Sequence, residues 1–201
     1  MKTTYLATAT LVAAAVSASA QVSTNNALSY NSIHAFYAGS NSQDSFGVAA
    51  QAQLGASNFF VDAGFESNSG KSSLAGYNDR QASIDIGYKL SVGPGDVNLT
   101  VGYVQDKESL AAFPDASSGV TFGLGWRQKI NQTLEYGLSY VHTSGTISSN
   151  GANASNDDDA FTLEVRYYFA PKFDLSLGYT ADKFSGSSTA STWFIGVGYN
   201  F

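Results

Sequence analysis

Two histidines and no cysteine leave this 201-residue chain few side chains that could serve as a nucleophile or general base near neutral pH. His142 stands beside Thr143 and Ser144, and His34 lies in an irregular segment. No carboxylate is placed by spacing to orient either imidazole, as nucleophilic or general-base chemistry requires. We therefore expect no enzymatic activity, no catalytic residue and no cofactor. Catalysis is the third of three functions that we weigh below.

The acidic run Asp157-Asp158-Asp159 is the strongest candidate for metal binding. It lacks the alternating ligands and the glycine of a calcium-binding loop. The absence of cysteine also excludes thiolate metal sites and disulfides. We interpret the run as a solvated loop face and predict no metal site. Weak bridging of divalent ions at a lipopolysaccharide surface is the alternative.

A larger set of charged residues recurs at alternate positions within otherwise apolar or small-residue segments. Period-two placement puts such residues on one face of a strand. Asp106 and Asp174 follow the same pattern. The predicted set consists of Asp62, Glu66, Asp85, Lys89, Arg127, Lys129, Glu135, Glu164, Arg166 and Asp182.

The segments that carry these charges read as β-strands. In the last one, Trp193, Ile195 and Val197 lie on one face, while Phe194 and Gly196 lie on the other. The first segment is the weakest, because polar residues interrupt both of its faces. The sequence predicts ten strands, at about 28–37, 46–54, 59–66, 83–90, 97–104, 120–127, 134–140, 161–169, 173–180 and 193–201.

The connections between these segments alternate in length. Short turns fall at 55–57, 93–95, 131–132 and 170–172, and longer polar loops at 39–44, 67–79, 107–118, 143–159 and 184–191. Short turns on one side and long loops on the other are typical of outer-membrane barrels. The apolar face would be too large for a soluble monomer to expose. We predict a single all-β, antiparallel, up-and-down transmembrane β-barrel of ten strands, with eight as the alternative.

Composition and the chain start agree with export to a membrane. Only 13% of residues are charged and 43% are hydrophobic, and beyond the first twenty residues no apolar stretch is long enough for a transmembrane helix. The formal net charge of −6 disfavours nucleic-acid binding. Lys2, an apolar core at 6–16 and Ala18-Ser19-Ala20 form a signal peptide. We expect residues 1–20 to be cleaved and residues 21–201 to form the barrel.

The C-terminal segment resembles a known assembly signal. Gly196-Val197-Gly198-Tyr199-Asn200-Phe201 is similar to the terminal β-signal of Gram-negative outer-membrane proteins, which end in an aromatic residue, usually Phe. Phe194 departs from that pattern, where a polar residue is usual. The resemblance to small OmpX-like barrels or the OmpA membrane domain implies a location in the outer membrane. It also implies recognition of Gly196, Tyr199 and Phe201 by the barrel-assembly machinery.

The predicted interior leaves the function open between two main hypotheses. Interior charges could form salt bridges that plug a narrow barrel, which leaves a structural or surface-interaction role through the external loops. Alternatively, Asp62, Glu66, Asp85, Glu164 and Asp182 could line a small, passive, cation-leaning pore. We place the structural or surface role first. We expect a monomer whose partners are outer-membrane lipid and lipopolysaccharide.

Overall fold

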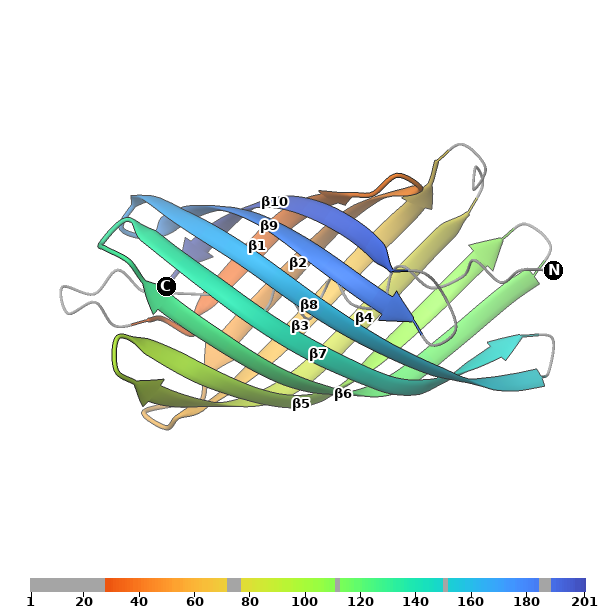
Figure 1. Cartoon of the computed structure of the whole chain (residues 1–201), viewed down its shortest axis with the longest axis horizontal. Helices are drawn as coiled ribbons and strands as arrows, with labels where there is room; N and C mark the ends of the chain where they lie inside the picture. The colour runs from red at the N-terminus through yellow and green to blue at the C-terminus, as the bar shows by residue number, and fades with distance from the viewer. Residues whose placement is uncertain (1–27, 72–76, 111–112, 150–151, 185–188) are drawn as a thin grey trace.

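A computed structural model describes residues 28–71, 77–110, 113–149, 152–184 and 189–201. Within these ranges ten antiparallel strands form one closed barrel in which every strand pairs with its neighbours along the chain and β1 pairs with β10 (Figure 1). The predicted ten-stranded up-and-down barrel is confirmed, and the eight-stranded alternative is wrong. The predicted signal peptide at 1–20 lies outside the described residues.

The strands differ in length around the barrel. β1 has 8 residues and β8 has 19. The bounds are β1 Ser32–Gly39, β2 Gln43–Gln53, β3 Phe59–Gly70, β4 Asn78–Val92, β5 Gly95–Leu110, β6 Phe113–Lys129, β7 Leu134–Ser149, β8 Ala152–Ala170, β9 Phe173–Phe184 and β10 Ala190–Asn200. The wall is therefore longest along β5 to β8.

The two ends of the barrel have different connections. The C-terminus and the turns after β2, β4, β6 and β8 lie at one end, which corresponds to the periplasmic side (Figure 1). The prediction of loops at 107–118 and 143–159 is wrong for most of these residues, because they belong to strands. β5 pairs with β6 as far as Leu110 and Phe113, and β7 pairs with β8 as far as Ser149 and Ala152. These parts of the strands extend above the apolar outer band, so neither of their faces needs apolar residues. Their Ser, Asn and Asp residues therefore give the pattern of a loop although the strands continue.

The outer surface is apolar, as the alternation predicts. Trp193, Ile195 and Val197 of β10 are 61%, 48% and 55% exposed, whereas their neighbours Phe194 and Gly196 face the interior. Every strand contributes exposed large apolar side chains. A closed barrel satisfies the backbone hydrogen bonds that hydrocarbon cannot. No helix in the described ranges has the length and apolar character needed to cross a membrane.

Inward aromatic rings fill the space that inward glycines leave on neighbouring strands. The rings of Phe36 and Phe60 occupy the positions where a Cβ on Gly47 and Gly87 would stand. Phe194 covers Gly178 in the same way. The phenylalanine that departs from the usual terminal signal is therefore an interior packing residue.

Candidate functional site

The structure places all ten predicted charged residues in the barrel interior. Lys89 is half-buried, and the other nine are at most 8% exposed. Their roles separate by depth. Positive and negative groups meet near the periplasmic turns, whereas carboxylates dominate toward the other end.

Arg127 is the centre of the periplasmic network. Its Nε and Nη2 both donate to Glu135 Oε1, at 2.9 and 2.8 Å. Both residues are 1% exposed. The other oxygen of Glu135 accepts a hydrogen bond of 2.8 Å from the Tyr168 hydroxyl. The Lys129 ammonium lies 5.6 Å from the centre of the Tyr168 ring. Strands β6, β7 and β8 are thus joined by charge and hydrogen bonds inside the barrel.

Tyr30, which precedes β1, extends this network to the opposite wall. Its hydroxyl donates to Asn98 Oδ1 at 2.6 Å and lies 3.1 Å from Asp96 Oδ2. Lys89 Nζ lies 4.2 Å from the centre of the Tyr30 ring, and the Arg127 guanidinium lies 4.9 Å from it. Both distances are within the range of cation–π attraction. Tyr30 lies within the first predicted strand, 28–37, but polar residues interrupt the alternation there and the sequence gives it no role in the lumen; in the structure β1 begins only at Ser32.

Arg166 holds a second group of the periplasmic network. Its Nη2 donates to Glu164 Oε1 at 2.9 Å, and its Nη1 lies 3.3 Å from His34 Nε2. His34 Nδ1 lies 3.8 Å from Asp174, whose other oxygen accepts 2.8 Å from Asn200 Nδ2. These contacts link β8, β1, β9 and β10. Together with the contacts of Arg127 and Tyr30, they connect most of the barrel circumference at this end.

The extracellular half of the interior has the opposite character. Among the side chains that the structure describes, six carboxylates face inward there and are at most 7% exposed: Glu66, Asp79, Asp106, Glu108, Asp158 and Asp182. We call them the outer acidic cluster. The carboxyl groups of Asp79 and Asp106 are close enough to interact directly. The Lys and Arg residues described toward this end, Lys71, Arg80, Lys107 and Lys183, are at exposed or half-exposed positions.

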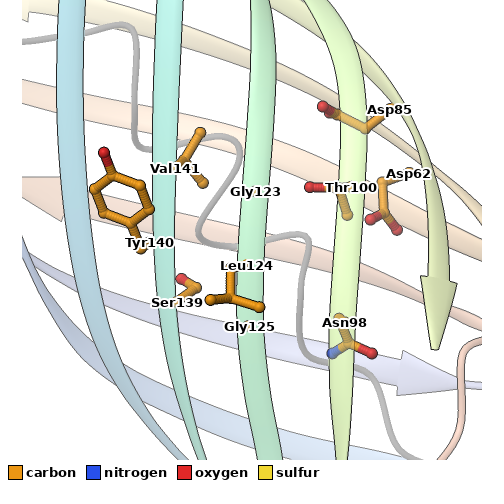
Figure 2. Close-up of a pocket in the computed structure, with 10 residues that line it drawn as sticks. All are labelled: Asp62, Asp85, Asn98, Thr100, Gly123, Leu124, Gly125, Ser139, Tyr140 and Val141. Atoms are coloured by element: carbon orange, nitrogen blue, oxygen red, sulfur yellow. The ribbon is translucent and has the colours of Figure 1, made fainter. Parts of the chain in front are cut away.

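Between the two halves, Asp62 and Asp85 lie directly opposite each other on β3 and β4. They border a cavity of about 20 Å³ that Asn98, Thr100 and Gly123 also line (Figure 2). This volume holds about one water molecule. The Thr121 hydroxyl donates to Asp85 Oδ1 at 2.6 Å. The space is too small for a solute larger than water.

On the outer surface, register places carboxylates where none was expected. Asp159 is the direct partner of His142, and its Oδ1 lies 3.0 Å from His142 Nδ1. Inside the barrel, Asp174 lies beside His34. The premise that no carboxylate accompanies either histidine is therefore wrong. The acidic run is also not a loop face, because it belongs to β8 with Asp158 buried inside and Asp159 half-exposed outside.

The described ranges contain no group of three or more His, Asp or Glu residues arranged to hold a metal ion. At the C-terminus, Gly196 faces inward and Tyr199 faces outward, where its ring packs 5.2 Å from Phe173. The Phe201 amide donates to the Asn31 carbonyl at 3.2 Å. The predicted assembly residues thus lie beside β1, at the seam that closes the barrel.

Comparison with known proteins gives similarity of structure alone. No protein-family model matches the chain, and no curated protein matches it in sequence. The outer-membrane protease OmpT from Escherichia coli is similar at a TM-score of 0.53 and 12% identity, over 85% of this chain and 97% of that one. A neisserial surface protein, NspA, is 14% identical at a TM-score of 0.44, over 86% and 98% of the two chains. The KdgM porin in complex with oligogalacturonate is 10% identical at 0.45, over 85% and 99%.

The closed barrel, its apolar exterior and its polar interior define the class of the protein. It is a small, single-chain β-barrel of the Gram-negative outer-membrane type, and it resides in the outer membrane. At these levels of identity, the similarity to OmpT extends to the fold and not to its proteolytic activity.

Proposed function

We propose that the protein is a non-conducting outer-membrane barrel with a structural or surface-interaction role. The observation that carries this proposal is the cross-lumen network around Arg127, Tyr30 and Arg166. Its side chains hydrogen-bond across the periplasmic end from several strands, and narrow barrels of this size are filled by their own side chains. Bulk water and solutes would have no continuous path through this layer.

The extended wall of β5 to β8 supports the surface role. Beyond the apolar band, its described outward side chains include Ser144, Thr146 and Ser148, all exposed. Such a polar sheet offers hydroxyl groups to a partner outside the cell. The outward apolar band on every strand supports a monomer surrounded by lipid and lipopolysaccharide. The terminal residues Gly196, Tyr199 and Phe201 support recognition by the barrel-assembly machinery.

Conductance in planar lipid bilayers tests the proposal. The purified full-length barrel should insert without steady conductance steps. Replacing Arg127 and Arg166 with serine should introduce steps if the network is the barrier. Steady steps from the wild-type protein, at the same insertion efficiency, would overturn the non-conducting role. A folded-state check comes from the different gel mobility of heated and unheated samples.

The outer acidic cluster favours a second candidate, a cation-leaning pore. Six inward carboxylates at one mouth would attract cations and repel anions. This candidate expects steady, cation-selective steps from the wild-type barrel. Replacing Glu66 with Gln and Asp106 with Asn should then reduce the preference for cations. The same recordings therefore separate the two candidates.

A further inference from the structure

An outward-facing pair of residues, His142 and Asp159, lies at the upper edge of the apolar band. On the same face of β7, Leu138 and Tyr140 lie below His142, and Ser144 and Thr146 lie above it. The same change occurs on β8, where Phe161 lies below Asp159 and Asp157 lies above. The pair therefore stands where hydrocarbon gives way to the polar interface of the outer leaflet. The ester groups of membrane lipids lie at this depth.

The hydrogen bonds of the pair orient the imidazole. His142 Nδ1 lies 3.0 Å from Asp159 Oδ1, and the Tyr140 hydroxyl donates to the same oxygen at 2.5 Å. A carboxylate that accepts from Nδ1–H fixes the tautomer in which Nε2 can accept a proton. The two side chains are 39% and 47% exposed, so they are open to the lipid surface. His142 is thus arranged as a general base facing outward.

Ser144 supplies a hydroxyl on the same face. It follows His142 by two residues on β7, a spacing that places both side chains on one side of the strand. Its Oγ donates to Asp157 Oδ1 at 2.9 Å, and Ser155 donates to the other oxygen of Asp157 at 3.2 Å. In the structure this hydroxyl is directed to Asp157, so its action as a nucleophile requires that it exchange the hydrogen bond to Asp157 for one to His142.

The neighbouring strands place a cation and an aromatic ring beside the pair. Lys183 of β9 is the register partner of Asp159 and is exposed. Phe122 of β6 is the register partner of His142 and is 53% exposed. An ammonium group suits a lipid phosphate or a developing oxyanion, and an exposed ring suits an acyl chain. The row from Phe122 to Lys183 thus fits an amphipathic ester.

From this arrangement, we propose that His142, Asp159 and Ser144 form a hydrolase site for acyl esters of outer-leaflet lipids. Ser144 Oγ attacks the ester carbonyl carbon while its proton passes to His142 Nε2. The carbon–oxygen bond to the lipid alcohol breaks, and that oxygen takes the proton from His142. Water then attacks the acyl-serine with His142 again as base, which releases a free fatty acid and regenerates Ser144. His142 and Ser144 are the catalytic residues, and Asp159 is a positioning residue.

Release of fatty acid from defined lipids tests the site. The full-length barrel is reconstituted in phospholipid vesicles, with and without added lipopolysaccharide, and free fatty acids are measured. Release in both preparations identifies phospholipid esters, and release only with lipopolysaccharide identifies its acyl chains. His142→Ala and Ser144→Ala should each lower the rate by about 10²–10⁴-fold. Ser69→Ala, which removes an exposed outward-facing hydroxyl from β3, is the matched control and should keep the wild-type rate.

Asp159 is tested through the kind of loss that its replacement causes. Asp159→Asn should lower kcat and leave KM unchanged, and Asp159→Glu should recover part of the rate. A raised KM with an unchanged kcat would contradict the positioning role. Release that is equal in wild type and His142→Ala, or absent from wild type in both lipid preparations, would overturn the proposal. Full activity of Ser144→Ala would overturn the assignment of the nucleophile.

Discussion

The two ends of the barrel interior manage buried charge in opposite ways. Near the periplasmic turns, each of the two arginines has a carboxylate within 3 Å, as in the pairs Arg127–Glu135 and Arg166–Glu164. Toward the extracellular end, the outer acidic cluster brings six inward carboxylates together, and the Lys and Arg residues described there are exposed or half-exposed. The Arg127–Glu135 pair joins β6 to β7, and Arg166, which pairs with Glu164 on its own strand, reaches β1 through His34. Carboxylates alone form no ion pairs with one another, so fewer contacts join the strands at this end and the lumen there favours cations.

This difference assigns separate tasks to the two ends. The periplasmic network supplies the barrier that the proposed non-conducting role requires. The extracellular end carries the acidic cluster inside, the extended wall above and the His142–Asp159 pair outside. Contacts with the environment are thus concentrated at the end where internal cross-linking by ion pairs is weaker. Substitutions at matched positions test how far this division holds.

The largest expected effect comes from removing Arg127. Arg127→Ala leaves Glu135 buried without its cation, and breaking a buried pair in this way costs about 3–5 kcal/mol. The free energy of unfolding in urea, followed by the fluorescence of Trp126 and Trp193, measures the loss. Replacing both Arg127 and Glu135 with leucine should recover most of the stability. A loss below about 1 kcal/mol for the single variant would show that the network does not hold this end together.

A smaller effect is expected from filling the glycine space at the same end. A Cβ at Gly87 would overlap the Phe60 ring, which also packs 4.9 Å from the Tyr30 ring. Overpacking of this kind costs about 1–3 kcal/mol. Gly137→Ala is the matched control, because the nearest atoms to its Cβ would be 3.7 and 3.9 Å away. Equal urea midpoints for the two variants would mean that Phe60 moves aside freely and does not lock Tyr30 in place.

The sequence predicts the barrel well because period two depends on local pattern alone. Residues such as Glu135 and Arg166 could be assigned to the interior by parity, that is, by the alternation of inward and outward side chains along a strand. Their contacts could not be assigned in the same way, because the Arg127–Glu135 pair depends on the register of β6 against β7, and the contact of Arg166 with His34 depends on how close β8 lies to β1 inside the barrel. The sequence predicts loops where β5 to β8 extend, for a related reason. Where both faces of a strand lie beyond the apolar band, apolar alternation is lost although the backbone ladder continues.

The rim shows the same limit at the level of a single site. His142 and Asp159 are 17 residues apart, and only the register of β7 against β8 brings them together. That register depends on the length of the β7–β8 hairpin, where the sequence pattern predicts an open loop at 143–159. Tyr30 shows the same limit, because its segment alternates too poorly for the sequence to assign it a partner inside the barrel. Parity identifies which face a residue occupies, and register identifies its partner.

Within the outer acidic cluster, Asp106→Asn should behave unlike Arg127→Ala. Asp79 and Asp106 are neighbouring carboxyl groups in the lumen, and two negative charges so placed repel each other. An asparagine amide at position 106 supplies a donor to Asp79 without the negative charge. We expect the free energy of unfolding to change by about 1 kcal/mol or less, in the stabilising direction. A loss comparable to that of Arg127→Ala would remove the contrast between the two ends.

The smallest effect is expected at the exposed counterpart of the Arg127 pair. Lys71 Nζ lies 2.7 Å from Asp44 Oδ1 at the extracellular end, but the two side chains are 36% and 34% exposed. Exposed pairs of this kind gain little, because water and salt screen the attraction and two mobile side chains lose entropy. Lys71→Ala should therefore leave the urea midpoint within the error of the wild-type measurement at 0.15 M salt. Since Arg127–Glu135 has nearly the same separation, 2.8 Å, the difference between the two variants isolates burial as the cause. If the urea midpoint of Lys71→Ala fell as far as that of Arg127→Ala, the exposed and the buried ion pair would contribute equally to stability.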